Sequence, residues 1–224
     1  MLSHRFAFCA SILIVVASQW AVAQTVQQTY EDGSPKAEGE LNLGDKDGLW
    51  TYYYQDGTVS ARIQYDRGGR DGFSLYYGFD GLLTGREYWD HDLLQDSAYY
   101  YFPGGGLEKA GIYRNGLYQG EWRFFHPNGQ LRKLVYYQEG LPDGVFRVYT
   151  EKGRLLQSGA FKDGLEIGEW RFYNERGRLK FVGSYEQGKR VAPWYKMNWL
   201  NQPYPYHFEE EEEGEGPGAG RNKP

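Results

Sequence analysis

The sequence predicts an all-β protein, a repeat array of antiparallel β-hairpins with a 24-residue period that forms an elongated, twisted meander sheet. One observation is the spacing of glycine, which recurs every 24 residues at Gly57, Gly81, Gly105, Gly129, Gly153 and Gly177. A fixed period of this length indicates a repeat architecture. The other is composition, since the 21 Tyr, 12 Phe and 7 Trp favour strands. No unit has room for an apolar stripe of helical period.

The first 23 residues predict a signal peptide. Arg5 supplies a positive charge, an apolar run follows, and Ala21 and Ala23 form a small-x-small cleavage site. We expect cleavage after Ala23 and a periplasmic or secreted mature chain. The alternative is an uncleaved anchor. The single cysteine, Cys9, lies inside this segment, so the predicted mature chain has no thiol chemistry.

Each repeat begins with a strand that carries large residues on both faces, because adjacent strand residues point in opposite directions. One set comprises Tyr52, Tyr76, Tyr100, Phe124, Val148 and Phe172. The opposite set comprises Tyr53, Tyr77, Tyr101, Phe125, Tyr149 and Tyr173. We expect core to cover one face, and the other to be either covered as well or an exposed aromatic ladder.

The second strand of each repeat follows a glycine turn. Pro103 and Pro127 stand two residues before the periodic glycine, which favours a type I turn closed by a glycine bulge. Even spacing predicts that Val59, Ile63 and Tyr65, with their equivalents, face one way. Glycines replace Ile63 in several repeats, and Trp50, Trp122, Trp170 and Trp194 share a phase, so each glycine is expected to admit a Trp ring from the neighbouring strand.

The ends of the array are fragments of the same pattern. The predicted organisation is a signal peptide (1–23), an N-terminal partial repeat or cap (24–46), six hairpin repeats (47–190), a C-terminal capping strand (191–200) and a disordered acidic Gly/Pro tail (201–224). Consecutive glutamates at 209–213 repel one another and predict disorder for the tail.

The units DGLWTYYYQDGTVSARIQY, GEWRFFHPNGQLRKLVYYQEG and GEWRFYNERGRLKFVGSYEQG resemble the bacterial variant of the MORN repeat, over about residues 30–199. Proteins of this type often carry the label of YwqK-type antitoxins of toxin–antitoxin systems. The resemblance implies an extended array of β-hairpins that serves as a binding scaffold and has no catalytic centre.

Little in the sequence indicates catalysis or metal binding. The net charge is −5 and no basic block stands out, which argues against nucleic acid and anionic membrane surfaces. We expect no catalytic residues, no metal, no cofactor and no integral membrane domain after cleavage. His126 is interpreted as a surface turn residue. Asp90-His91-Asp92 is either a metal or acid–base site or, as we favour, a loop that has drifted from the consensus.

The sequence therefore predicts an exported, non-enzymatic scaffold for protein–protein interaction in the periplasm or cell envelope. The partner is an unknown protein. A cell-wall or envelope-glycan module and an antitoxin or immunity-type protein are the alternatives. Because the third unit departs most from the consensus, His91 joins the ladder as a candidate. The candidate binding residues are Tyr53, Tyr77, Tyr101, Phe125, Tyr149, Tyr173 and His91.

Overall fold

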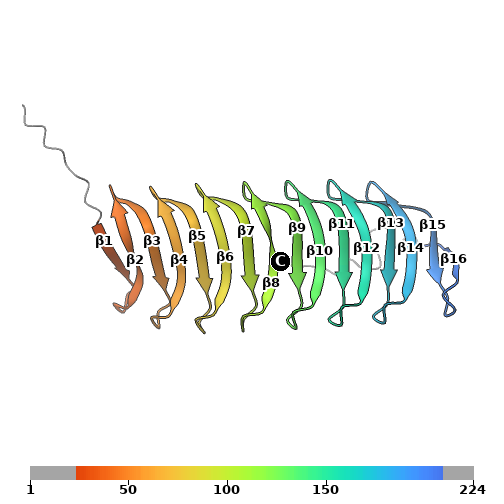
Figure 1. Ribbon diagram of the computed structural model, residues 1–224, viewed down its shortest axis with the longest axis horizontal. Coiled ribbons are helices and arrows are strands. Elements are labelled where there is room, and N and C mark those ends of the chain that lie inside the picture. The colour runs from red at the N-terminus through yellow and green to blue at the C-terminus, as the bar shows by residue number, and fades with distance from the viewer. Residues whose placement is uncertain (1–23, 209–224) are drawn as a thin grey trace, which may run out of the picture.

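The computed structural model describes residues 24–208, and these form one antiparallel sheet of sixteen strands in sequence order (Figure 1). The described residues contain no helix, so none offers a helical membrane span. The expected all-β hairpin meander is confirmed. Its strands are β1 (Gln24–Thr29), β2 (Pro35–Asn42), β3 (Asp45–Tyr53), β4 (Val59–Asp66), β5 (Gly69–Tyr77), β6 (Leu83–Asp90), β7 (Leu93–Tyr101), β8 (Leu107–Arg114), β9 (Leu117–Phe125), β10 (Leu131–Gln138), β11 (Leu141–Tyr149), β12 (Leu155–Lys162), β13 (Leu165–Tyr173), β14 (Leu179–Glu186), β15 (Lys189–Met197) and β16 (Pro203–Tyr206).

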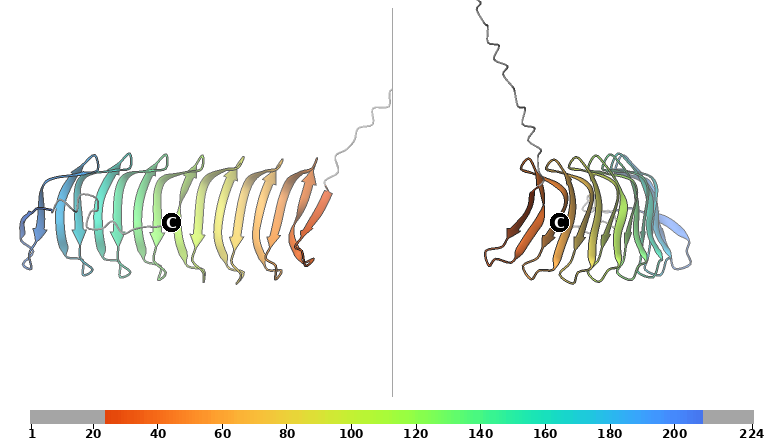
Figure 2. Two further views of the ribbon diagram at one scale, coloured as in Figure 1. Left: turned by 180° about the vertical axis from the view of Figure 1, so that it is seen from behind. Right: turned by 60° about the vertical axis from the view of Figure 1, so that its left-hand side comes forward.

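The sheet is a single layer. Figure 2 shows bowed strands in an elongated, gradually turning row, with turns along both long edges. No second layer of described residues covers either face, so the core expected on one face is built by that face's own side chains. The large rings on this face pack against one another, and Trp50 and Trp122 are fully buried in this way. We call this side, which bears Trp50, Trp122, Trp170 and Trp194, the tryptophan face.

Two kinds of turn alternate along the chain. In the turn after β3, the N–H of Gly57 donates to the carbonyl of Tyr54 (2.9 Å), and the N–H of Tyr54 donates to the carbonyl of Thr58 (2.8 Å). Gly57 has a φ of 85°, as the predicted type I turn with a glycine bulge requires. Turns at the opposite edge have two central residues, such as Arg67 and Gly68, both with positive φ, and match type I′ hairpins.

The Asp90-His91-Asp92 segment is one of these two-residue turns. His91 and Asp92 have φ values of 49° and 63°, and Asp92 occupies the position that glycine fills in the equivalent turns. Its carboxylate accepts a hydrogen bond from the backbone N–H of Arg70 (3.0 Å). The sequence departs from the consensus here, but the backbone keeps the consensus turn.

The predicted Trp–Gly contacts are confirmed on the tryptophan face. A Cβ at Gly111, Gly159 or Gly183 would lie only 2.2 Å from the ring of Trp122, Trp170 or Trp194, respectively. Gly39 and Trp50 form a fourth pair, at 2.5 Å. Real Cβ atoms never approach so closely, so only glycine leaves room for the ring.

A bulge at the start of each second strand corrects one facing prediction. Tyr52 pairs with Ala61, whereas Tyr53 pairs with Val59, so Ser60 is an extra residue. Val59 therefore lies beside Tyr53 and away from Ile63 and Tyr65. The same shift recurs in the later hairpins. The prediction from even spacing is wrong because alternation fails across a bulge.

The C-terminal boundary also differs from the prediction. Strand β16 pairs with β15 inside the segment assigned to a disordered tail, so that assignment is wrong for residues 203–208. The reason is burial, since the rings of Tyr206 and Phe208 pack against Phe181 at 5.2 and 6.5 Å. Strand β15 begins at Lys189, before the predicted capping strand. At the N-terminus, β1 and β2 form a complete hairpin. The predicted signal peptide and residues 209–224 lie outside the described residues.

Candidate binding surface

The predicted aromatic ladder lies on the side of the sheet opposite the tryptophan face. Its six members stand one per repeat at the ends of β3, β5, β7, β9, β11 and β13, and all are half-buried: Tyr53, Tyr77, Tyr101, Phe125, Tyr149 and Tyr173. The bulge described above places Val59 and its equivalents beside them, which explains why the rings are only partly exposed. Neighbouring rings are about 10 Å apart, because two strand spacings separate them.

Hydrogen bonds between turns fix the backbone of the ladder from one repeat to the next. The hydroxyl of Tyr30 donates to the carbonyl of Tyr53 (2.7 Å), and that of Tyr54 donates to the carbonyl of Tyr77 (2.8 Å). His126 occupies the same position, with Nε2 2.9 Å from the carbonyl of Tyr149. His126 therefore links two repeats, a role that the sequence analysis did not foresee.

A row of arginines runs next to the ladder, and the sequence analysis missed it. The arginines are connected in the register through other residues on the intervening strands, such as Leu75 and Leu134. All five guanidinium side chains are exposed: Arg62, Arg86, Arg123, Arg147 and Arg171. The row extends from β4 to β13, about 40 Å along the sheet. In the sequence, Arg62 and Arg86 are 24 residues apart, and so are Arg123, Arg147 and Arg171. Only the strand register shows that these two subsets form one row. We call this side the tyrosine–arginine face.

A third row on this face mixes exposed apolar residues with acidic ones, because Glu121 and Glu169 occupy the positions equivalent to Phe73 and Val145. Phe73 is 49% exposed, Ile112 46% and Val145 40%. Phe73 packs edge-on against Tyr88, with ring centres 5.2 Å apart, and the guanidinium of Arg86 lies 4.7 Å from the Phe73 ring. Glu121 and Glu169 form ion pairs with Arg123 (2.5 Å) and Arg171 (2.6 Å). The face thus combines aromatic, cationic, acidic and aliphatic groups on a strand framework.

His91 does not join the ladder. It lies at the edge formed by the two-residue turns, whereas Tyr101 lies at the other end of β7, about 26 Å away. The side chain of His91 bonds to Asp90 and lies 3.6 Å from Asp71, and these carboxylates, Asp90 first, raise the pKa of His91. Ligand atoms of the three residues lie within 4.8 Å of one another, with Asp90 and His91 exposed and Asp71 half-buried. Two carboxylates and one imidazole are only a partial ligand set.

The third repeat departs from the consensus for a packing reason. Ala98 replaces the periodic Trp, and on the neighbouring strand β6 Glu87 replaces the glycine that contacts this Trp elsewhere in the array. Glu87 is only 9% exposed and accepts hydrogen bonds from Trp89 Nε1 (3.1 Å) and the Tyr100 hydroxyl (2.7 Å). Burial strongly raises the pKa of Tyr100, and its hydrogen bonds to Tyr113 and Glu87 add to this shift. A buried polar network therefore replaces a Trp–Gly contact.

The fold and surface define a class, a single-layer β-hairpin repeat protein with two chemically distinct open faces. In this chain, residues 46–67 and 118–139 match the model of the MORN repeat variant. The two matched segments cover parts of the first and fourth repeats.

Other comparisons give weaker similarity. No curated protein matches the chain. Solved structures titled "Crystal Structure of TcdB2-TccC3" and "Crystal Structure of TcdB2-TccC3-Cdc42" are each 11% identical, over 78% and 81% of this chain, with TM-scores of 0.18 and 0.19. The chain spans only 14% and 15% of the lengths of those two chains.

Proposed function

We propose that this chain is an exported, non-catalytic scaffold whose tyrosine–arginine face binds a partner protein in the periplasm or cell envelope. The observation that carries the proposal is the register, which places a row of exposed arginines beside a row of half-exposed rings along ten consecutive strands. Tyr and Arg are enriched among the residues that dominate binding energy at protein interfaces. The match to MORN repeat variants, a repeat type used as a binding scaffold, supports the same function.

The arginines also define the partner's chemistry. A guanidinium group binds carboxylates through two parallel hydrogen bonds, and the arginines of β9, β11 and β13 repeat about every 10 Å. The partner is therefore an elongated protein surface that presents carboxylates and apolar side chains. Export from the cytoplasm rests on the signal sequence alone.

Changing Arg123, Arg147 and Arg171 together to alanine is expected to weaken partner binding at least about 30-fold, the effect of losing about 2 kcal/mol at a hot spot. The partner is first captured from envelope extract with residues 24–224 as bait, and its affinity for purified variants is then measured by titration calorimetry. The thermal midpoint should stay unchanged, since the three side chains are exposed.

A second triple variant, Arg67→Ala with Arg114→Ala and Arg176→Ala, removes the same charge from exposed positions away from this arginine row. It should bind normally. Equal loss in both triple variants would show that net charge alone drives binding. Normal binding in the first variant would contradict the proposed surface.

The alternatives give different outcomes. An envelope-glycan module would sediment with purified peptidoglycan and lose this property when Tyr149 and Tyr173 are changed to alanine, because sugar rings stack on aromatic side chains. An antitoxin or immunity-type function would require the captured partner to be a toxin that the chain neutralises.

A further inference from the structure

A separate inference concerns the tryptophan face. Its middle row is continuous in the register from β8 to β15 and carries three lysines but no acidic residue: Lys109, Phe124, Lys133, Val148, Gln157, Phe172, Phe181 and Lys196. The ammonium groups of Lys109 and Lys133 lie 4.2 and 4.4 Å from the rings of Tyr100 and Phe124. Among residues 24–208, no carboxylate is within ion-pair distance of these lysines. Burial lowers the pKa of Lys133, as expected for a cation that lacks an anionic partner.

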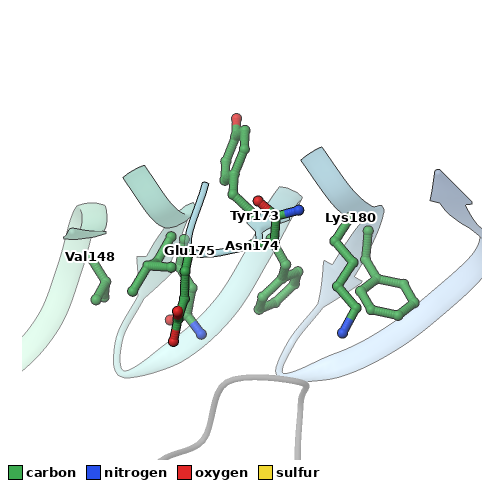
Figure 3. Close-up of a pocket in the computed structure, with 9 residues that line it drawn as sticks. Val148, Tyr173, Asn174, Glu175 and Lys180 are labelled. Carbon is green, nitrogen blue, oxygen red and sulfur yellow. The ribbon is translucent and has the colours of Figure 1, made fainter. Parts of the chain in front are cut away.

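A hollow separates Lys133 from Lys196 on this row. It has a volume of about 470 Å³, and its lining includes Val148, Gln157, Phe172, Phe181 and Lys180, together with one acidic residue, Glu175. Figure 3 shows that Val148, Glu175 and Lys180 point to one side of the sheet and Tyr173 to the other. The side chains of Val148, Glu175 and Lys180 therefore line the hollow on the tryptophan face, and Tyr173 is the ladder residue that borders it.

The last described residues direct the chain onto this face. Phe208 packs edge-on against Trp194, with ring centres 5.3 Å apart, and the guanidinium of Arg190 lies 3.9 Å from the Phe208 ring. The next seven residues, 209–215, contain six glutamates. Lys133 lies four strands from β14, about 19 Å away, and seven extended residues span about 23 Å.

We propose that residues 209–215 lie back across the hollow of the tryptophan face, with their carboxylates against Lys196, Lys180 and Lys133. Three observations favour this segment as the occupant: its negative charge complements the lysines, its extended length reaches Lys133, and it begins next to Phe208 on this face. A tethered segment also has an effective concentration in the millimolar range, which a separate acidic protein would need to match. The chain would thus cover part of its own exposed aromatic layer and leave the tyrosine–arginine face open.

Carbodiimide cross-linking of the isolated chain, residues 24–224, tests this contact because the reagent joins a carboxylate and an amine that are already paired. We expect amide links from the tail glutamates to Lys133, Lys180 or Lys196. The Lys162–Asp143 ion pair, at 2.8 Å, is an internal positive control. Mixing isotope-labelled and unlabelled chains distinguishes links within one chain from links between copies.

The variant Phe208→Ala keeps every carboxylate and removes the ring that holds the chain on this face. Tail links to Lys133 should fall severalfold, while the Lys162–Asp143 link remains. Tail links only to lysines elsewhere, links only between copies, or no tail link while the control pair reacts would each overturn the proposal. Because no partner is present, the result is independent of the proposed function.

Discussion

Replacing Gly111 with isoleucine is expected to lower the free energy of unfolding by about 3 kcal/mol, at the upper end of the cost of overpacking a core. The Cβ would lie 2.2 Å from Cδ2 of Trp122, whose side chain is fully buried and whose Nε1 donates to the carbonyl of Ile112 (3.0 Å). The ring cannot move without losing both its burial and this hydrogen bond. Urea denaturation followed by circular dichroism measures the change.

A compensating substitution makes the test specific. At the junction of the first and second repeats, Ile63 and Ser74 occupy the positions of Gly111 and Trp122 and pair directly across β4 and β5. Trp122→Ser alone should cost about 3–5 kcal/mol, because it removes a buried ring. The double variant, Gly111→Ile with Trp122→Ser, copies the Ile63–Ser74 pair and should lose clearly less stability than the sum of the single changes. Strictly additive losses would contradict the proposed packing rule.

Glu87→Ala is expected to cost about 2–3 kcal/mol, since it leaves the buried Trp89 Nε1 and the half-buried Tyr100 hydroxyl without their acceptor. Glu87→Gln keeps one acceptor oxygen and should cost less. Glu139→Ala removes a carboxylate from an exposed turn and serves as the control, with almost no change expected. Thermal melts of the three variants compare these effects. Equal midpoints for Glu87→Ala and Glu139→Ala would show that the buried network does not stabilise the third repeat.

Most of the fold could be predicted because its determinants are local and periodic. Gly57 fixes a turn in the first unit, and the glycines that follow at 24-residue intervals predict the same turn in every later unit. The Trp–Gly contacts could be predicted as well, because both residue types recur in phase in neighbouring strands. Strand β16 could not, since its stability comes from rings that meet only in the folded chain, such as Phe208 on Trp194.

The candidate surface was only partly predictable. The aromatic ladder lies on one face as expected, because all its members occupy one phase of the repeat. The arginine row required the register, since Arg62 lies on a second strand of its hairpin and Arg147 on a first strand. Sequence proximity groups His91 with Tyr101, but the nine-residue strand β7 separates them in space.

The central claim is that a partner protein binds the tyrosine–arginine face. Gln157 and Ser158 are adjacent residues of β12, and they pair with Val148 and Arg147 on opposite sides of the sheet. A photoactivatable cross-linking residue placed at either position therefore samples one face in the presence of envelope extract. The account predicts a covalent adduct with another protein from position 158 and none from position 157. An adduct with another protein from position 157 alone would contradict it.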